Sequence, residues 1–172
     1  MKKIICLAGL FLGLAWNVAM AQDKVEILEA SLDYALAQLN EDYEMLLDFT
    51  YPGIISSVGG RNAMEKTLIQ VNQTQKTKGK FLIDYRVKEA TVTKLVGEEF
   101  HALIPITTVT QVPGGKITTE SVLIGVLSIP DHRWYFIETA TLTERNIPKV
   151  LPQWDFTLNL PLKKAPVFKE ER

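Results

Sequence analysis

Apolar residues recur every three or four positions from Asp23 to Phe49, with charged residues between them. This period predicts an amphipathic helix with one buried stripe. The sequence Thr50-Tyr51-Pro52-Gly53 ends this helix, because proline disfavours helical geometry at the residue before it. A short helical turn is expected over Ile54–Val58, and a second long helix is predicted from Arg61 to Lys76, after two glycines.

After Lys80 the apolar period becomes two, which predicts β-strands. The expected strands are Phe81–Leu95, Phe100–Val112, Lys116–Ile129 and Trp134–Thr141. The breaks between them, at Val96-Gly97-Glu98, Pro113-Gly114-Gly115 and Pro130-Asp131-His132, are short enough for hairpins. The pattern therefore predicts an α+β fold in which helices precede an antiparallel meander of four or more strands.

The last segment, Glu144 to Arg172, has a different character. Its four prolines exclude long helices. Apolar residues nevertheless alternate along part of it, at Trp154, Phe156, Leu158, Leu160 and Leu162. An extended segment with one apolar edge needs a surface to lie on. Its end, Lys169 to Arg172, is expected to be a frayed, charged terminus.

The predicted sheet is apolar on both faces. The face expected beneath the helices contains Phe81, Ile83, Tyr85, Val87, Phe100, Ala102, Ile104, Ile106, Leu123, Leu127, Trp134 and Phe136. The opposite face contains Val92, Leu103, Val109, Val122, Ile124, Val126 and Ile137. Burying each such side chain is worth about 1.5–3 kcal/mol, so the second face also requires a cover.

Two covers for this second face are open, and both could apply. One is the C-terminal tail, and the other is a second copy of the chain. We favour a homodimer wrapped in part by the tail, through Leu103, Val122, Ile124, Val126 and Ile137.

The N-terminus has the features of a secretory signal peptide over residues 1–21. Lys2 and Lys3 precede an apolar run, and Ala19-Met20-Ala21 is a small-x-small cleavage site. Cleavage before Gln22 predicts an exported protein, periplasmic or secreted, without stable membrane insertion. We expect one domain over residues 22–143 and an extended tail over 144–172.

Composition narrows the function classes. The single cysteine, Cys6, lies in the signal segment, so the mature chain has no disulfide and no thiolate site. Removing Lys2 and Lys3 from 19 basic residues leaves 17 against 20 acidic ones, a net charge of −3. This balance does not favour nucleic-acid binding. The two histidines lack metal-ligand spacing, and we expect no metal and no cofactor.

Two stretches resemble a known superfamily. They are LLDFTYPGIISSVGGRNAMEKTL, residues 46–68, and RWYFIE, residues 133–138. With the element order, they resemble the nuclear transport factor 2-like superfamily of cystatin-like α+β cones, roughly over Asp23 to Thr141. The resemblance implies helices packed on the concave face of a strongly bent sheet, a pocket inside the cone and a dimer through the outer face. The superfamily includes ketosteroid isomerases, dehydratases and polyketide cyclases besides noncatalytic domains, so fold alone does not choose the function.

Glu138 is the candidate catalytic residue. It shares the helix-covered face with Trp134 and Phe136, and we expect it beside Gly125 and near Ile104, where a missing side chain leaves room. A carboxylate in an apolar cavity would have a raised pKa and act as a general acid or base. The alternative is that Glu138 reaches water or pairs with a basic group.

Other polar residues have simpler interpretations. Tyr43, Tyr51 and Tyr85 are candidate hydroxyl donors for the same cavity. His101 is expected on the outer face, at a rim or interface, with no acid nearby, and His132 in an exposed turn. We interpret Gly59-Gly60 as a hinge between helices, although the turn and Arg61 also suit an anion.

The leading hypothesis is an exported, noncatalytic domain that binds a small apolar or amphipathic ligand or a protein partner. The expected pocket lining is Tyr43, Tyr85, Ile104, Leu123, Phe136 and Glu138. The first alternative is an isomerase, dehydratase or cyclase with Glu138 as base. The second is a structural accessory module of the cell envelope whose tail docks on another protein.

Overall fold

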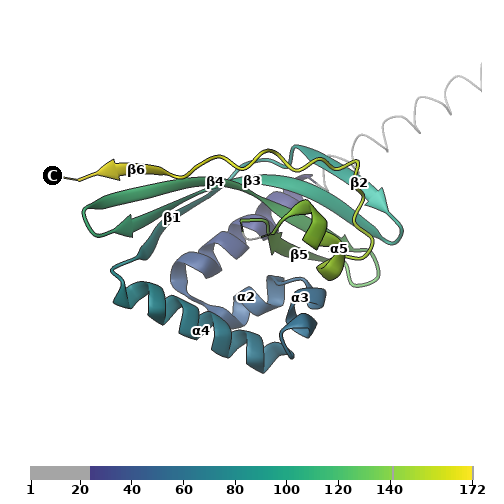
Figure 1. The fold of residues 1–172 in the computed structure, drawn as a ribbon. Coiled ribbons are helices and arrows are strands. Elements are labelled where there is room, and N and C mark those ends of the chain that lie inside the picture. Colours follow the sequence, from purple (N-terminus) through teal and green to yellow (C-terminus); the bar gives the residue numbers. More distant parts are fainter. Residues whose placement is uncertain (1–23, 141, 172) are drawn as a thin grey trace, which may run out of the picture.

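The computed structural model describes residues 24–140 and 142–171 (Figure 1). The expected signal peptide, residues 1–21, and its cleavage site before Gln22 lie outside these residues. Within the described ranges, no helix combines the length and apolarity needed to cross a membrane.

The N-terminal region is helical. After a first helix at residues 24–40 come α2 (Tyr43–Phe49), α3 (Pro52–Ser57) and α4 (Arg61–Thr77). The prediction of one unbroken helix from Asp23 to Phe49 is wrong, because the chain turns at Glu41, whose φ is 57°. Asp42 then caps α2 by accepting a hydrogen bond from the Met45 amide at 3.0 Å. Aspartate at this position is a strong helix-start signal.

Six strands form one curled antiparallel sheet. They are β1 (Phe81–Val87), β2 (Val92–Val96), β3 (Glu99–Val112), β4 (Gly115–Ser128), β5 (Arg133–Glu138) and β6 (Val167–Glu170). The main order is β1-β3-β4-β5, with β2 on β3 and β6 on β4. This confirms the predicted α+β architecture of helices on the concave face of a bent meander, followed by an extended tail.

The first predicted strand, Phe81–Leu95, is in fact two strands. β1 and β2 pair with different stretches of β3, and residues 88–91 lie between them. This break lies beside Pro105 of β3, whose carbonyl accepts a hydrogen bond from Lys88 N at 2.9 Å but which has no N–H to return. A proline inside a strand removes a ladder hydrogen bond, which explains the break.

The predicted face of two residues at the start of β1 is wrong, because the strand has a bulge between Leu82 and Asp84. The extra residue inverts the inward–outward alternation at the start of β1. Phe81 and Ile83, which were expected under the helices, are 45% and 46% exposed. Leu82 packs against the core instead.

The core on the concave side is filled by side chains from both layers. Phe136 of β5 lies at its centre, with ring centroids 5.2 Å from Tyr34 of the first helix and 5.9 Å from Phe49 of α2. Its buried members are Ile27, Tyr34, Ala35, Ala37, Leu46, Tyr85, Ala102, Ile104, Ile106, Leu123, Trp134 and Phe136. The helices therefore cover the face that the sequence assigned to them.

The tail covers the middle of the outer face. After a short 3₁₀ turn (Glu144–Asn146) and α5 (Ile147–Val150), it runs extended along the side of the sheet away from α2 and α4 (Figure 1). Four of its side chains, Ile147, Leu151, Trp154 and Leu158, form a second buried cluster with the sheet. We call Leu103, Val122, Ile124, Val126 and Ile137 the outer apolar patch, and each is at most 8% exposed.

Within one chain, the tail is the cover of the outer apolar patch. The homodimer stays a prediction, and a dimer through these five side chains would first require the tail to move. The tail alternation is only partly followed, because turns at residues 152–153 and 156–158 interrupt the extended chain. Phe156, within the second turn, is 63% exposed, and Leu162, beyond it, is 94% exposed.

The C-terminus is paired, which corrects the prediction of a frayed end. β6 pairs with Gly115–Thr118 of β4, and Glu171 N donates to the Gly114 carbonyl at 3.1 Å. Lys116 and Glu171 also form an ion pair. A side chain at Gly115 would collide with the Lys169 carbonyl, so glycine permits this close approach.

Candidate functional site

Glu138 lies at the end of β5, on the concave side as predicted, but its neighbours differ. It pairs with Leu123, whereas Gly125 pairs with Phe136. The space above Gly125 is occupied by side chains of Ile27, Ile104 and Trp134. The room that the sequence suggested beside a glycine is therefore filled by the core.

Three donors converge on one oxygen of Glu138. Oε1 accepts hydrogen bonds from the hydroxyls of Tyr34 at 3.3 Å and Tyr85 at 3.2 Å. Gln38 Nε2 lies 3.3 Å from the same oxygen and donates to the Tyr34 hydroxyl at 2.8 Å. We call these four residues the Glu138 cluster. It joins the first helix, β1 and β5.

The electrostatics of this cluster favour protonated tyrosines around a carboxyl group. The surrounding protein removes water from the carboxyl group, and this desolvation raises the pKa of Glu138. The hydrogen bonds from Tyr85 and Tyr34 act in the opposite direction and lower it. Burial, and then the charge of Glu138, raise the pKa values of both tyrosines. Glu138 is exposed along part of its side chain, as the alternative interpretation expected, so water screens the carboxylate and moderates its shift.

Tyr34 and Gln38 were missed by sequence reasoning, and two predicted tyrosines do not join the cluster. Tyr43 accepts from Asn72 Nδ2 at 2.6 Å, and Tyr51 donates to Glu99 at 3.2 Å. The signal that could have identified the missed pair is their spacing of four, which places both on one side of a helix.

The remaining predicted pocket residues are core residues. Tyr85, Ile104, Leu123 and Phe136 are between 0% and 7% exposed and belong to one packed cluster. Tyr43 packs at its margin. Their side chains pack against one another on the concave side.

Replacing Tyr85 by phenylalanine is expected to raise the pKa of Glu138 further. The change removes a hydrogen bond that favours the ionised carboxylate and keeps the buried ring. A ¹³C NMR titration of the Glu138 carboxyl would measure it. Tyr43→Phe, which removes a hydroxyl outside the cluster, is the control and should leave the titration unchanged. An unchanged or lower Glu138 pKa in Tyr85→Phe would contradict the assigned hydrogen bond.

His101 is buried beneath the tail, and the expectation that it has no acid nearby is wrong. It is 0% exposed, its Nε2 lies 3.0 Å from Glu99 Oε2, and its ring stacks on Trp154 with a centroid distance of 6.2 Å. Glu99 stands two residues earlier in β3, on the same face, so the i, i+2 spacing was a usable signal. Burial and the Glu99 charge raise the pKa of Tyr51, which also contacts Glu99, to about 12. His132 lies in an exposed turn, as predicted.

The glycine pair before α4 acts as the predicted hinge. Gly59 and Gly60 have φ values of 97° and 98°, which other residues rarely adopt. Arg61 is held by Asp48, 2.8 Å away, and by the Glu44 carbonyl at 2.9 Å.

Among residues 24–140 and 142–171, no group of three His, Cys, Asp or Glu side chains is placed to hold a metal ion.

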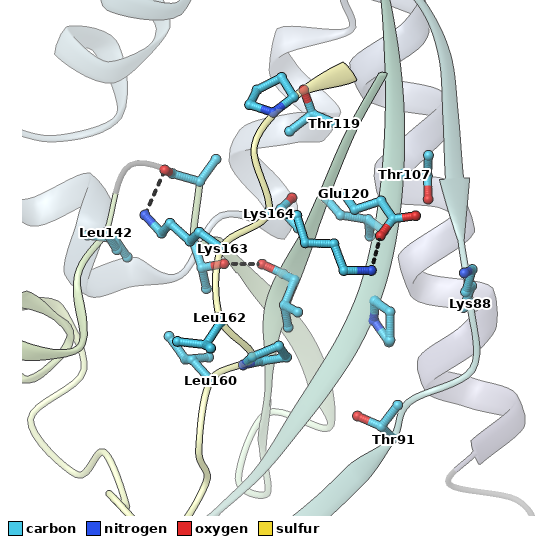
Figure 2. A pocket seen from close by; sticks show the side chains of 18 of the residues that line it. Lys88, Thr91, Thr107, Thr119, Glu120, Leu142, Leu160, Leu162, Lys163 and Lys164 are labelled. Atoms are coloured by element: carbon cyan, nitrogen blue, oxygen red, sulfur yellow. Dashed lines mark hydrogen bonds and ion pairs between the residues drawn. The ribbon is translucent and has the colours of Figure 1, made fainter. Parts of the chain in front are cut away.

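A cavity of about 640 Å³ lies on the outer side of the sheet, between β3, β4 and the tail (Figure 2). We call it the tail groove. Its lining combines Leu142, Leu160 and Leu162 with several threonines and charged side chains. Sequence reasoning missed it, because its walls depend on the path of the tail across the sheet.

Three lysines and one glutamate line the tail groove. Lys164 Nζ lies 2.6 Å from Glu120 Oε2, and Lys163 Nζ donates to the Ala140 carbonyl at 2.9 Å. The hydrogen bond from Lys164 lowers the pKa of Glu120, and the charge of Lys88 contributes to the same shift. The side-chain ammonium of Lys88 makes no hydrogen bond or ion pair with the described part of the chain, although its backbone N–H donates to Pro105.

Comparison with family models, with curated proteins and with solved structures gives no match for this chain.

Proposed function

We propose that this chain is an exported, noncatalytic binding domain of the nuclear transport factor 2-like type, and that it holds a small amphipathic molecule in the tail groove. The proposal rests on the position of the cavity, which lies on the outer side of the sheet under the tail. The concave side is packed with buried side chains, whereas the groove under the tail is hollow. Its volume of about 640 Å³ is within the range of small-molecule sites, about 300–1,000 Å³.

The lining supports an amphipathic ligand. Figure 2 shows Leu142, Leu160 and Leu162 gathered on one side of the groove, with Thr107 and Lys88 on the other. Apolar walls with a few polar groups are typical of sites that bury an apolar body and orient a polar end.

The mature protein is expected to bind Nile red, a neutral apolar dye, with a rise in fluorescence. Thr107 lies on the sheet wall of the groove, so Thr107→Trp should fill the space and weaken binding by roughly tenfold or more. Thr93→Trp, at an exposed position of β2 outside the groove, is the matched control and should bind as the parent does.

Native mass spectrometry of the protein purified from its own host provides a second measurement. We expect extra small-molecule mass that disappears on denaturation. A parent protein that carries no such mass and binds no dye would overturn the proposed function. Equal dye binding by parent and Thr107→Trp would place the ligand elsewhere and contradict the groove assignment.

The Glu138 cluster supports a second candidate, an isomerase, dehydratase or cyclase with Glu138 as base. The raised pKa of Glu138 and its two tyrosine neighbours favour this alternative. The packed side chains beside the cluster weigh against it, since a substrate would need to displace them. Turnover abolished by Glu138→Gln but retained in Glu120→Gln would establish the enzyme instead.

The accessory-module alternative also has a specific observation in its favour. Phe156 and Leu162 are exposed on the tail, and the concave side is filled, as a docking module would require. It predicts a protein partner and no bound small molecule, so the same native mass measurement separates it from the proposed function.

A further inference from the structure

The tail groove is locally positive in a chain that is negative overall. Lys88, Lys163 and Lys164 line it against Glu120 alone, whereas the whole sequence has a net charge of −1. A local excess of one sign attracts a ligand group of the opposite sign. A cationic ligand would instead be repelled by these lysines.

Two of the lysines can bind a negatively charged ligand group. Apart from the hydrogen bond of its backbone N–H to Pro105, Lys88 makes no hydrogen bond or ion pair with residues 24–140 and 142–171, so its side-chain ammonium has three donors to offer. Lys164 is held by Glu120 through an exposed ion pair, with side-chain exposures of 75% and 49%. Exposed pairs of this kind contribute little net stability, so another anion can replace the glutamate.

The apolar part of the groove lies apart from Lys88, whereas Lys163 and Lys164 follow Leu162 directly in the tail. Leu142 and Leu160 pack at the margin of the buried cluster under the tail, and Leu162 stands at the solvent edge. In Figure 2 the leucines lie on the tail side, whereas Lys88 and Thr91, from the segment between β1 and β2, lie on the opposite side. A ligand that contacts both regions needs an apolar chain and a charged head.

We infer that the ligand of the tail groove is an anionic amphiphile, an alkyl or acyl chain with a carboxylate or phosphate head. Its head replaces Glu120 on Lys164 and contacts Lys88, and its chain lies along Leu142, Leu160 and Leu162. This inference rests on the proposed function and specifies the ligand class. Because Lys164 belongs to the tail and Lys88 follows β1, the bound head would connect the tail to the sheet as Glu120 does in this structure.

The test compares four probes of one chain length by isothermal titration calorimetry, below their micellar concentrations. They are dodecanoate, dodecyl phosphate, neutral dodecyl maltoside and dodecyltrimethylammonium. We expect the two anions to bind roughly tenfold or more tighter than the neutral and cationic probes. Whichever anion binds tighter identifies the head as a carboxylate or a phosphate.

Variants of the lining separate head recognition from chain burial. Lys88→Met combined with Lys164→Met should remove the preference for anions and leave binding of dodecyl maltoside unchanged. Glu120→Gln should tighten anion binding, because it removes the competing carboxylate. Lys78→Met, an exposed lysine outside the groove, is the control and should change nothing.

The outcomes separate failure of the anionic-ligand inference from failure of the proposed groove-binding function. Equal binding of neutral and anionic probes, or tighter binding of the cation, overturns the anionic ligand and leaves a groove-binding function in place. An anion preference that survives the double lysine variant also overturns it. Failure of all four probes and of Nile red overturns the proposed function itself.

Discussion

Trp154→Ala is expected to lower the free energy of unfolding by about 3–5 kcal/mol. The indole is 5% exposed, packs in the cluster that covers the outer apolar patch, and stacks on the buried ring of His101. Truncation leaves a cavity and uncovers His101 together with Glu99. Urea denaturation followed by circular dichroism would measure the loss.

The tail offers a matched control two residues further along. Phe156 is a comparably large aromatic residue on the same segment, but it is 63% exposed. Phe156→Ala should change the free energy of unfolding by no more than about 0.5 kcal/mol. Equal losses in the two variants, or a loss below about 1 kcal/mol in Trp154→Ala, would contradict the assignment of the tail as a structural cover.

A chain that ends at residue 143 is expected to self-associate. It lacks Ile147, Leu151, Trp154 and Leu158, and therefore exposes the outer apolar patch. Large contiguous apolar patches drive association of otherwise soluble domains. Size-exclusion chromatography with light scattering, over a range of concentrations, would show the mass rising relative to the full mature chain.

The control for this truncation is a chain that ends at residue 166. It loses β6, whose four residues are all exposed, and Glu171 with its contacts to Gly114 and Lys116, but it keeps the cover. It should retain the oligomeric state of the full chain. If the chain ending at 143 instead behaves as a stable, monodisperse monomer, then the tail is dispensable and the outer apolar patch tolerates water.

The same measurement bears on the homodimer expected from the sequence. A full-length dimer that uses the outer apolar patch must open the tail, so it should become more abundant when the tail is removed. A full-length dimer that is unaffected by truncation would use another surface.

Local patterns predicted much of the fold. The change of period after Lys80 located the helix-to-sheet boundary, because periods of 3.6 and 2 are distinct over long segments. Glycine-containing turns located the β2–β3 and β3–β4 hairpins, and Pro130-Asp131-His132 located the β4–β5 hairpin. The break between β1 and β2 was not predicted because its cause, Pro105, lies on a neighbouring strand.

The candidate site was harder to predict because its contacts are distant in sequence. The face of Glu138 followed from alternation, but its partner Tyr34 is 104 positions away and its register depends on the whole meander. The tail groove depends on where an irregular segment crosses the sheet. Alternation alone treated Leu158 and Leu162 alike, although one is 3% and the other 94% exposed.

The position of the cover at the C-terminal end also has a consequence during synthesis. A ribosome delivers residues in order, so β5 is complete at Glu138 about 20 residues before Leu158 leaves it. At about 5–20 residues per second, this interval lasts roughly one to four seconds. During this interval the outer apolar patch of the nascent chain is uncovered. A prematurely terminated chain that lacks the tail is therefore expected to aggregate and to bind chaperones.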